Sequence, residues 1–153
     1  MNIQSRGSNQ LGADRLDGMV EALSHITFIV RDLDRMQVFL ESVFGATEIY
    51  TSGDRTFSVS REKFLLIGGT WVAIMEGEPL TERSYNHVAF KIRDDDYDVF
   101  AGRLRKLGIE MREGRSRVAG EGRSLYFHDY DNHLFELHTG TLYERLMRYR
   151  QGL

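Results

Sequence analysis

The 153-residue chain contains no cysteine. This excludes disulfides, a protein thiol nucleophile and any cysteine-ligated metal, and it fits a reducing compartment such as the cytoplasm. No apolar run approaches the ~20 residues that a membrane-spanning helix needs. The formal net charge of −3 provides no basic surface for nucleic acid. What remains is the composition of a globular protein with one ordinary domain, or with two small modules that share a core.

The first eighteen residues, "MNIQSRGSNQLGADRLDG", lack the apolar segment of a signal peptide and show no periodicity. We expect residues 1–18 to be a disordered extension or a cloning remnant, with Met19 as a plausible natural start. The folded domain is expected over residues 19–140.

An internal repeat organises this domain. The segment "SHITFIVRDLDRMQVFLESVFGA", from Ser24, resembles "NHVAFKIRDDDYDVFAGRLRKLGI", from Asn86. In this alignment His25 falls on His87. A repeat of about sixty residues indicates two copies of one supersecondary unit that bury their apolar faces together.

Each copy begins with a strand of alternating polarity and continues with an apolar stripe at helical spacing. Asp32 or Asp34 is expected to cap the first helix, and residues 94–96 the second. Three short strands follow: "TFSVS", "KFLLIG" and "WVAIME" in the first copy, "MREG", "SLYFHD" and "HLFELH" in the second. The sequence therefore predicts an α+β fold of two βαβββ modules, over about 21–78 and 83–140, and a C-terminal helix within 141–153.

A carboxylate, Glu136, lies in the middle of the apolar strand "HLFELH". A buried, ionised carboxylate is costly unless it is paired or bound to a metal. Carrying the repeat offset onward places Ile74 over Glu136, and it places His25, His87 and Glu136 opposite the helix-packing faces. Two imidazoles and one carboxylate suit a divalent transition metal, and three protein ligands leave positions open for water or substrate.

Other interpretations remain open at this point. The repeated histidines could be remnants of symmetry, and His128, His133 and His138 are read as ordinary strand histidines. Glu76 shares the parity of Ile74 and is a weak candidate for a fourth ligand. The arginine-rich segment "REGRSRVAGEGRS" is either a solvated loop or a loop over an anion site.

Paired βαβββ modules with this ligand pattern resemble the vicinal oxygen chelate superfamily, which has the glyoxalase-like fold. The resemblance covers essentially everything from Met19 onward. Within it, "LSHITFIVRDLD", "YNHVAF" and "EGRSLYFHDYDNHLFELHTGTL" resemble fosfomycin resistance proteins. "SGDRTFSVSREKFLLI" and "IMEGEPLTERSYNH" resemble the FosX branch, whose members are epoxide hydrolases.

The resemblance implies that His25, His87 and Glu136 bind Mn(II), and that Glu62 is the general base activating water for attack at C1 of fosfomycin. The product would be a diol. It also implies a domain-exchanged homodimer in which each metal site is shared between chains. The implied substrate-binding residues are Thr27, Phe64, Tyr85, Ser124, Tyr126 and Arg145.

The segment "GEGRS" departs from the acidic, "SEGDS"-like potassium loop of the glutathione-transferring relatives. Gly120 replaces a serine and Arg123 an aspartate, which argues against a potassium site and against thiol transfer. Ile74 removes one of the four ligands of glyoxalase I. The remaining alternatives are a metal-dependent thiol transferase acting on fosfomycin and a non-catalytic member of the superfamily that binds a small ligand.

Overall fold

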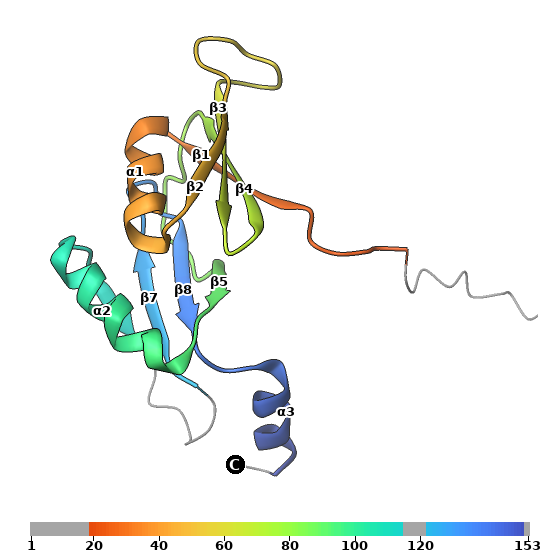
Figure 1. Ribbon diagram of the computed structural model, residues 1–153, viewed down its shortest axis with the longest axis vertical. Helices are drawn as coiled ribbons and strands as arrows, with labels where there is room; N and C mark the ends of the chain where they lie inside the picture. The colour runs from red at the N-terminus through yellow and green to blue at the C-terminus, as the bar shows by residue number, and fades with distance from the viewer. Residues whose placement is uncertain (1–18, 115–121, 152–153) are drawn as a thin grey trace, which may run out of the picture.

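The computed structural model describes residues 19–114 and 122–151, so the expected extension over residues 1–18 lies outside the described residues. Two four-stranded sheets follow one another along the chain, with helices α1 and α2 on the same side of the molecule (Figure 1). The first module contains β1 (His25–Val30), α1 (Leu33–Phe44), β2 (Thr47–Thr51), β3 (Glu62–Ile67) and β4 (Thr70–Glu76). The second contains β5 (His87–Lys91), a 3₁₀ turn (Asp94–Asp96), α2 (Tyr97–Lys106), β6 (Met111–Glu113), β7 (Ser124–His128) and β8 (Leu134–His138).

The two sheets have the same topology. Their strand orders are β1-β4-β3-β2 and β5-β8-β7-β6, and in each sheet the first strand pairs in parallel with the last. The predicted pair of βαβββ modules is therefore confirmed. The chain ends in helix α3 (Leu142–Arg150). Among the described residues, no helix combines the length and apolar character needed to cross a bilayer.

One hydrophobic core joins the modules. The buried face of α1 packs on its own sheet, and its aromatic residues also reach the second sheet. The ring centroids of Phe44 and Phe135 lie 5.4 Å apart, and those of Phe39 and Phe127 lie 6.3 Å apart. The side of each sheet that faces away from α1 and α2 is called the open face below.

The predicted helix cap is confirmed in the first module and corrected in the second. Asp32 caps α1 by accepting a 2.9 Å hydrogen bond from the backbone N–H of Arg35, and α1 ends at Gly45 with φ = +67°. Residues 94–96 form the 3₁₀ turn instead of a cap, and α2 begins with no side-chain cap bond. Asp94 pairs with Arg123, 3.1 Å away.

The prediction of a strand at "TFSVS" is wrong. The strand of the first module is β2 (Thr47–Thr51), which pairs with β3. Phe57 and Val59, whose alternation suggested a strand, are 62% and 87% exposed. They lie in the loop between β2 and β3, where the Phe57 ring lies 4.9 Å from the guanidinium carbon of Arg55.

The placement of Ile74 over Glu136 is also wrong. His25 pairs with Trp71 in the first sheet, whereas His87 pairs with Leu134 in the second, so Ala73 is the counterpart of Glu136. The hairpin from Ser124 to its paired residue His138 is one residue longer than the equivalent hairpin from Glu62 to Met75, which shifts the alignment by one. A shift of one residue in a strand exchanges its faces, and Ile74 is accordingly fully buried in the core.

Candidate metal centre

His87 and Glu136 converge on the open face of the second sheet. Glu136 lies opposite Ala89 on β5, so its side chain shares a face with His87, and Nε2 of His87 lies 2.9 Å from Oε2 of Glu136. Nδ1 of His87 lies 2.7 Å from the carbonyl oxygen of Tyr85. Because a carbonyl only accepts, Nδ1 carries a proton, which leaves Nε2, on the side of Glu136, as the ring atom that can bind a metal. This is the tautomer of a metal-binding histidine.

The carboxylate of Glu136 is held in place by neighbouring strands. Glu136 is 4% exposed, and the hydroxyl of Ser124 lies 2.5 Å from its Oε1. Burial alone would raise the pKa of Glu136, but hydrogen bonds from Ser124 and Tyr126, with the nearby His138 and His87, lower it below its usual value. The group is thus an anion at neutral pH, as a metal ligand must be.

Two tyrosines border this pair. The hydroxyl of Tyr85 lies 3.3 Å from that of Tyr126, and the Tyr126 ring stands edge-on to His87 at 5.6 Å. Burial and the hydrogen bonds with Tyr85 and Glu136 raise the pKa of Tyr126, which therefore stays a neutral phenol. Three of the predicted substrate-binding residues, Tyr85, Ser124 and Tyr126, consequently lie beside His87 and Glu136.

The third predicted ligand, His25, lies on the other sheet. It is on the open face of β1, where its ring centroid lies 4.3 Å from that of Trp71 and Nδ1 lies 3.1 Å from the hydroxyl of Ser24. Within residues 19–114 and 122–151, no three His, Cys, Asp or Glu side chains come together as a metal site. One chain therefore assembles two of the three predicted ligands.

The open face of the first sheet carries three more of the predicted residues. Thr27 and Phe64 both lie opposite Ala73, and the Phe64 ring is 5.1 Å from that of Trp71. Glu62, the first residue of β3, is only 8% exposed and shares this face. No periodicity distinguished Glu62 in the sequence; only the family resemblance did.

The repeat gives Glu62 a specific place. Glu62 lies opposite Met75 just as Ser124 lies opposite His138, so Glu62 and Ser124 occupy equivalent positions in the two modules. The neighbour that Ser124 contacts is Glu136, whereas the equivalent neighbour of Glu62 is Ala73. The first module therefore has no second carboxylate at this position.

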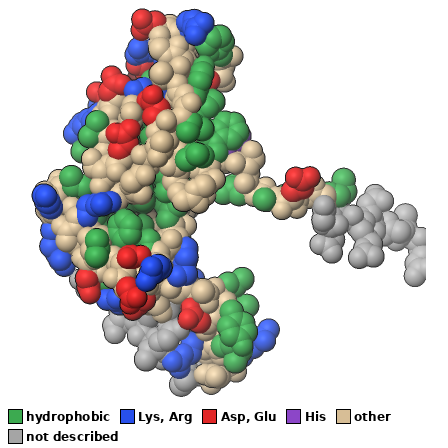
Figure 2. Space-filling view, viewed as in Figure 1, with side chains coloured by type: hydrophobic (Ala, Val, Ile, Leu, Met, Phe, Trp, Pro, Cys, Tyr) green, Lys and Arg blue, Asp and Glu red, His purple; other side chains and the backbone are tan. Residues whose placement is uncertain are grey.

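Arg145 lies on α3, which stands apart from both sheets (Figure 1). A capping box of Thr141 and Glu144 begins this helix, and none of its residues is buried. Its apolar side chains gather on an outward surface (Figure 2). They are Leu142, Tyr143, Leu146, Met147 and Tyr149, which are 36–73% exposed.

The remaining candidates have structural roles or lie outside the described residues. Glu76, considered as a fourth ligand, faces the helix side of its sheet and binds Arg61. His133 donates to Asp129 at 2.7 Å within the β7–β8 turn. Within the arginine-rich segment, residues 115–121 lie outside the described part of the chain.

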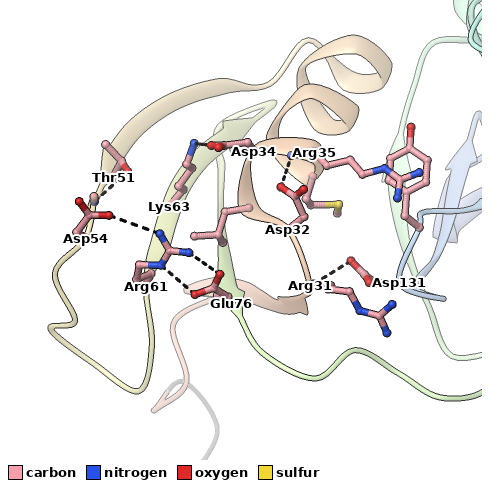
Figure 3. A pocket seen from close by; sticks show the side chains of 14 residues that line it. Arg31, Asp32, Asp34, Arg35, Thr51, Asp54, Arg61, Lys63, Glu76 and Asp131 are labelled. Atoms are coloured by element: carbon pink, nitrogen blue, oxygen red, sulfur yellow. Dashed lines mark hydrogen bonds and ion pairs between the residues drawn. The ribbon is translucent and has the colours of Figure 1, made fainter.

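A groove of about 680 Å³ lies beside the start of α1 and contains none of His25, His87 and Glu136 (Figure 3). Its charged side chains mostly pair with one another. Arg61 makes two hydrogen bonds to Glu76, at 2.5 and 2.9 Å, and Lys63 lies 2.6 Å from Asp34. These pairs lower the pKa values of Glu76 and Asp34 through the hydrogen bonds from their cationic partners. The groove is an ion-pair network on the helix side of the first sheet, away from the open faces.

Comparisons with known proteins show the family of the chain. Residues 22–137 match the model of the Glyoxalase/Bleomycin resistance protein/Dioxygenase superfamily. The chain is 65% identical over 135 residues to fosfomycin resistance protein FosX of Mesorhizobium japonicum, covering 88% of this chain and 97% of the relative. Metallothiol transferase FosB of Shouchella clausii is 38% identical over 138 residues, covering 87% and 90%.

A solved structure is also similar to this chain in sequence and in fold. It is a mutant FosX of Listeria monocytogenes complexed with Mn(II) and 1S,2S-dihydroxypropylphosphonic acid. It superimposes with a TM-score of 0.78 at 54% identity, covering 86% of this chain and 99% of that one. This chain therefore belongs to the glyoxalase/bleomycin resistance/dioxygenase superfamily and, within it, to the family of FosX fosfomycin resistance proteins.

Proposed function

We propose that this chain hydrolyses the epoxide of fosfomycin to a diol in a Mn(II)-dependent reaction and thereby confers resistance to the antibiotic. One observation carries the proposal. A FosX relative that covers most of this chain holds Mn(II) together with a dihydroxypropylphosphonic acid. That diol is what addition of water across the epoxide of a propylphosphonate yields. We place the enzyme in the cytoplasm, in agreement with its lack of cysteine.

His25, His87 and Glu136 would hold the metal. Imidazole nitrogen and carboxylate oxygen are ligands suited to this ion, and the tautomer of His87 and the ionised state of Glu136 fit the same role. When bound, Mn(II) supplies a Lewis acid that stabilises negative charge on the epoxide oxygen.

Glu62 is assigned as the general base. Its side chain is buried on an open face, and among the described residues no hydrogen bond is formed to its carboxylate oxygens, so they are free to accept a proton from water. The backbone N–H of Glu62 donates to the hydroxyl of Ser52 at 3.0 Å, which fixes the start of the strand.

The remaining pocket residues divide between the sheets. Thr27 and Phe64 would border the substrate from the first module, and Tyr85 and Tyr126 from the second. Arg145 would pair with the phosphonate, since a guanidinium matches the geometry of such an anion.

We further propose that two copies of the chain complete each other's sites as a domain-exchanged homodimer. Two features support this. His25 lies on a different sheet from His87 and Glu136, and α3 exposes an apolar surface next to Arg145. In such a dimer the open face of one chain's first module would meet the open face of its partner's second module.

Replacing Glu62 with glutamine tests the assignment of the base. The amide keeps the size of the side chain but accepts no proton, so hydrolysis should fall about 10²–10⁴-fold while binding of Mn(II) and fosfomycin is retained. Glu41→Gln, on the exposed outer surface of α1, is the matched control and should hydrolyse fosfomycin at the normal rate. Normal turnover by Glu62→Gln would eliminate Glu62 as the base.

A second candidate function is transfer of a thiol such as glutathione to the same epoxide, favoured by the 38% identity to a metallothiol transferase. Arg123 argues against it. In place of an acidic loop residue the chain has a guanidinium, which pairs with Asp94 and stacks on Tyr97. A non-catalytic role in binding a small ligand would leave fosfomycin unchanged.

A further inference from the structure

We infer that Ser124 and His138 form a hydrogen-bonded chain that positions the Glu136 carboxylate for the metal. This inference rests on the proposed function and assigns Ser124 a role different from substrate binding. The three side chains project from β7 and β8 onto the same open face, because Ser124 pairs directly with His138 and lies diagonally from Glu136.

The distances define the chain. The hydroxyl oxygen of Ser124 lies 2.5 Å from Oε1 of Glu136 and 2.9 Å from Nδ1 of His138. The same Nδ1 lies 3.5 Å from Oε1 of Glu136, so the three atoms form a closed triangle. Ser124 is 2% exposed and the side chain of His138 is 15% exposed, which limits competition from water.

The donors and acceptors available on each group fix the direction of each hydrogen bond. An ionised carboxylate only accepts, so the single proton of the Ser124 hydroxyl points to Oε1 of Glu136. The serine oxygen must then accept from His138, which requires a proton on Nδ1 of that ring. The order is His138 Nδ1–H to Ser124 Oγ–H to Glu136 Oε1, and it leaves Oε2 of Glu136 facing Nε2 of His87.

This assignment also limits what Ser124 can do for the substrate. A phosphonate oxygen is an acceptor, and the only proton of Ser124 is already donated to Glu136. Ser124 therefore acts through Glu136, as a positioning residue, and not by hydrogen bonding to the phosphonate. Outer partners of this kind orient metal ligands, and their loss typically reduces metal affinity 10–100-fold.

The first module offers an internal comparison. The residues equivalent to Ser124, Glu136 and His138 are Glu62, Ala73 and Met75. These three residues cannot form the same hydrogen-bonded chain. Ala73 has no carboxylate to be oriented, and the side chain of Met75 has no N–H to donate. The complete set occurs only where the module has a metal carboxylate.

Mn(II) affinity of the full-length protein, measured without fosfomycin by the electron paramagnetic resonance signal of free Mn(II), tests the inference. Ser124→Ala and His138→Ala should each bind Mn(II) about 10–100-fold more weakly and change the spectrum of the bound ion. His138→Asn places an amide N–H near the position of Nδ1 and should restore most of the affinity. His128→Ala, on the same face of β7, is the control and should bind as the unaltered chain does.

Three outcomes would overturn the inference. One is Mn(II) affinity unchanged in both alanine variants. Another is unchanged affinity with a raised KM for fosfomycin in Ser124→Ala, which would make Ser124 a substrate contact. The third is equal loss in His138→Ala and His138→Asn, which would indicate a purely steric role. Failure of the unaltered chain to bind Mn(II) would instead refute the proposed metal site itself. Circular dichroism of each metal-free variant controls for folding, and Ser124→Gly, which also removes the hydroxyl, replaces Ser124→Ala if the latter does not fold.

Discussion

Complementation between two inactive variants tests whether each metal site is shared between chains. His25 lies on the first sheet, whereas His87 and Glu136 lie on the second, and the described part of one chain gathers no three-ligand group. His25→Ala and Glu136→Ala should each lose nearly all Mn(II)-dependent hydrolysis when assayed alone. In a domain-exchanged dimer of one variant with the other, one site carries both substitutions and the other site carries neither.

The magnitude follows from this geometry. Random exchange of subunits makes about half of the dimers mixed, and each mixed dimer has one intact site of two, so the mixture should regain about a quarter of the normal activity. The two variants carry different affinity tags, are co-expressed, and the mixed dimer is purified. We expect one Mn(II) per mixed dimer and about half of the normal rate of fosfomycin hydrolysis by phosphorus NMR.

The opposite result is equally clear. If His25 and Glu136 of the same chain form one site, every site in the mixed dimer contains one substitution. A purified mixed dimer with no bound Mn(II) and no hydrolysis would therefore refute the shared site. The control is a dimer in which both differently tagged chains carry His25→Ala. It should stay inactive whether the metal site is shared between chains or formed within one chain.

Two further predictions concern stability. Phe135 is fully buried in the core that joins the modules, so Phe135→Ala should lower the free energy of unfolding, measured by urea titration, by about 3–5 kcal/mol. Val38 is 61% exposed on α1, so Val38→Ala should change this free energy by less than about 0.5 kcal/mol. Similar effects of the two substitutions would contradict the shared core. The hydrogen bonds from Arg61 lower the pKa of Glu76 below its ordinary value of 4.5, so the pair stabilises the fold above that pH and the stability is lost as the pH falls through the lowered pKa. The Tm difference between the unaltered chain and Glu76→Gln should therefore be largest above pH 4.5 and shrink below it, and a difference independent of pH would refute this.

The repeat was the most informative feature of the sequence. Local signals placed the opening strands and the helices correctly, because the alternation around Phe28 and the stripe through Leu40 are each produced by burial in one shared core. Asp32 marked the start of α1 for a reason confined to a few residues of backbone. Helix capping depends only on residues close in the sequence, so it can be predicted without knowledge of the tertiary fold.

Features that depend on strand pairing were harder to predict. Phe57 and Val59 alternate with polar residues as in a strand, but in the described structure they have no partner strand. The local sequence does not show whether a segment will pair with another strand. Ile74 was aligned with Glu136 because an offset was carried across a hairpin that, between equivalent paired residues, is one residue longer in the second module. Only the register shows that Ala73 is the true counterpart.

The candidate site depends on the same long-range information. His25, His87 and Glu136 could be selected from the repeat and from the chemistry of metal ligands. The chain from His138 through Ser124 could not, because it depends on which residues face each other across β7 and β8. Glu62 is an unremarked glutamate in the sequence and gains meaning from its buried place on the open face and from the FosX relatives.

The most direct test of the central claim is the mass of the product formed from fosfomycin and Mn(II) in ¹⁸O-labelled water, with and without glutathione. We predict a dihydroxypropylphosphonic acid that is heavier than fosfomycin by one labelled water, formed at the same rate in both reactions. A product that appears only with glutathione and carries the mass of the thiol would contradict hydrolysis and assign the chain to thiol transfer.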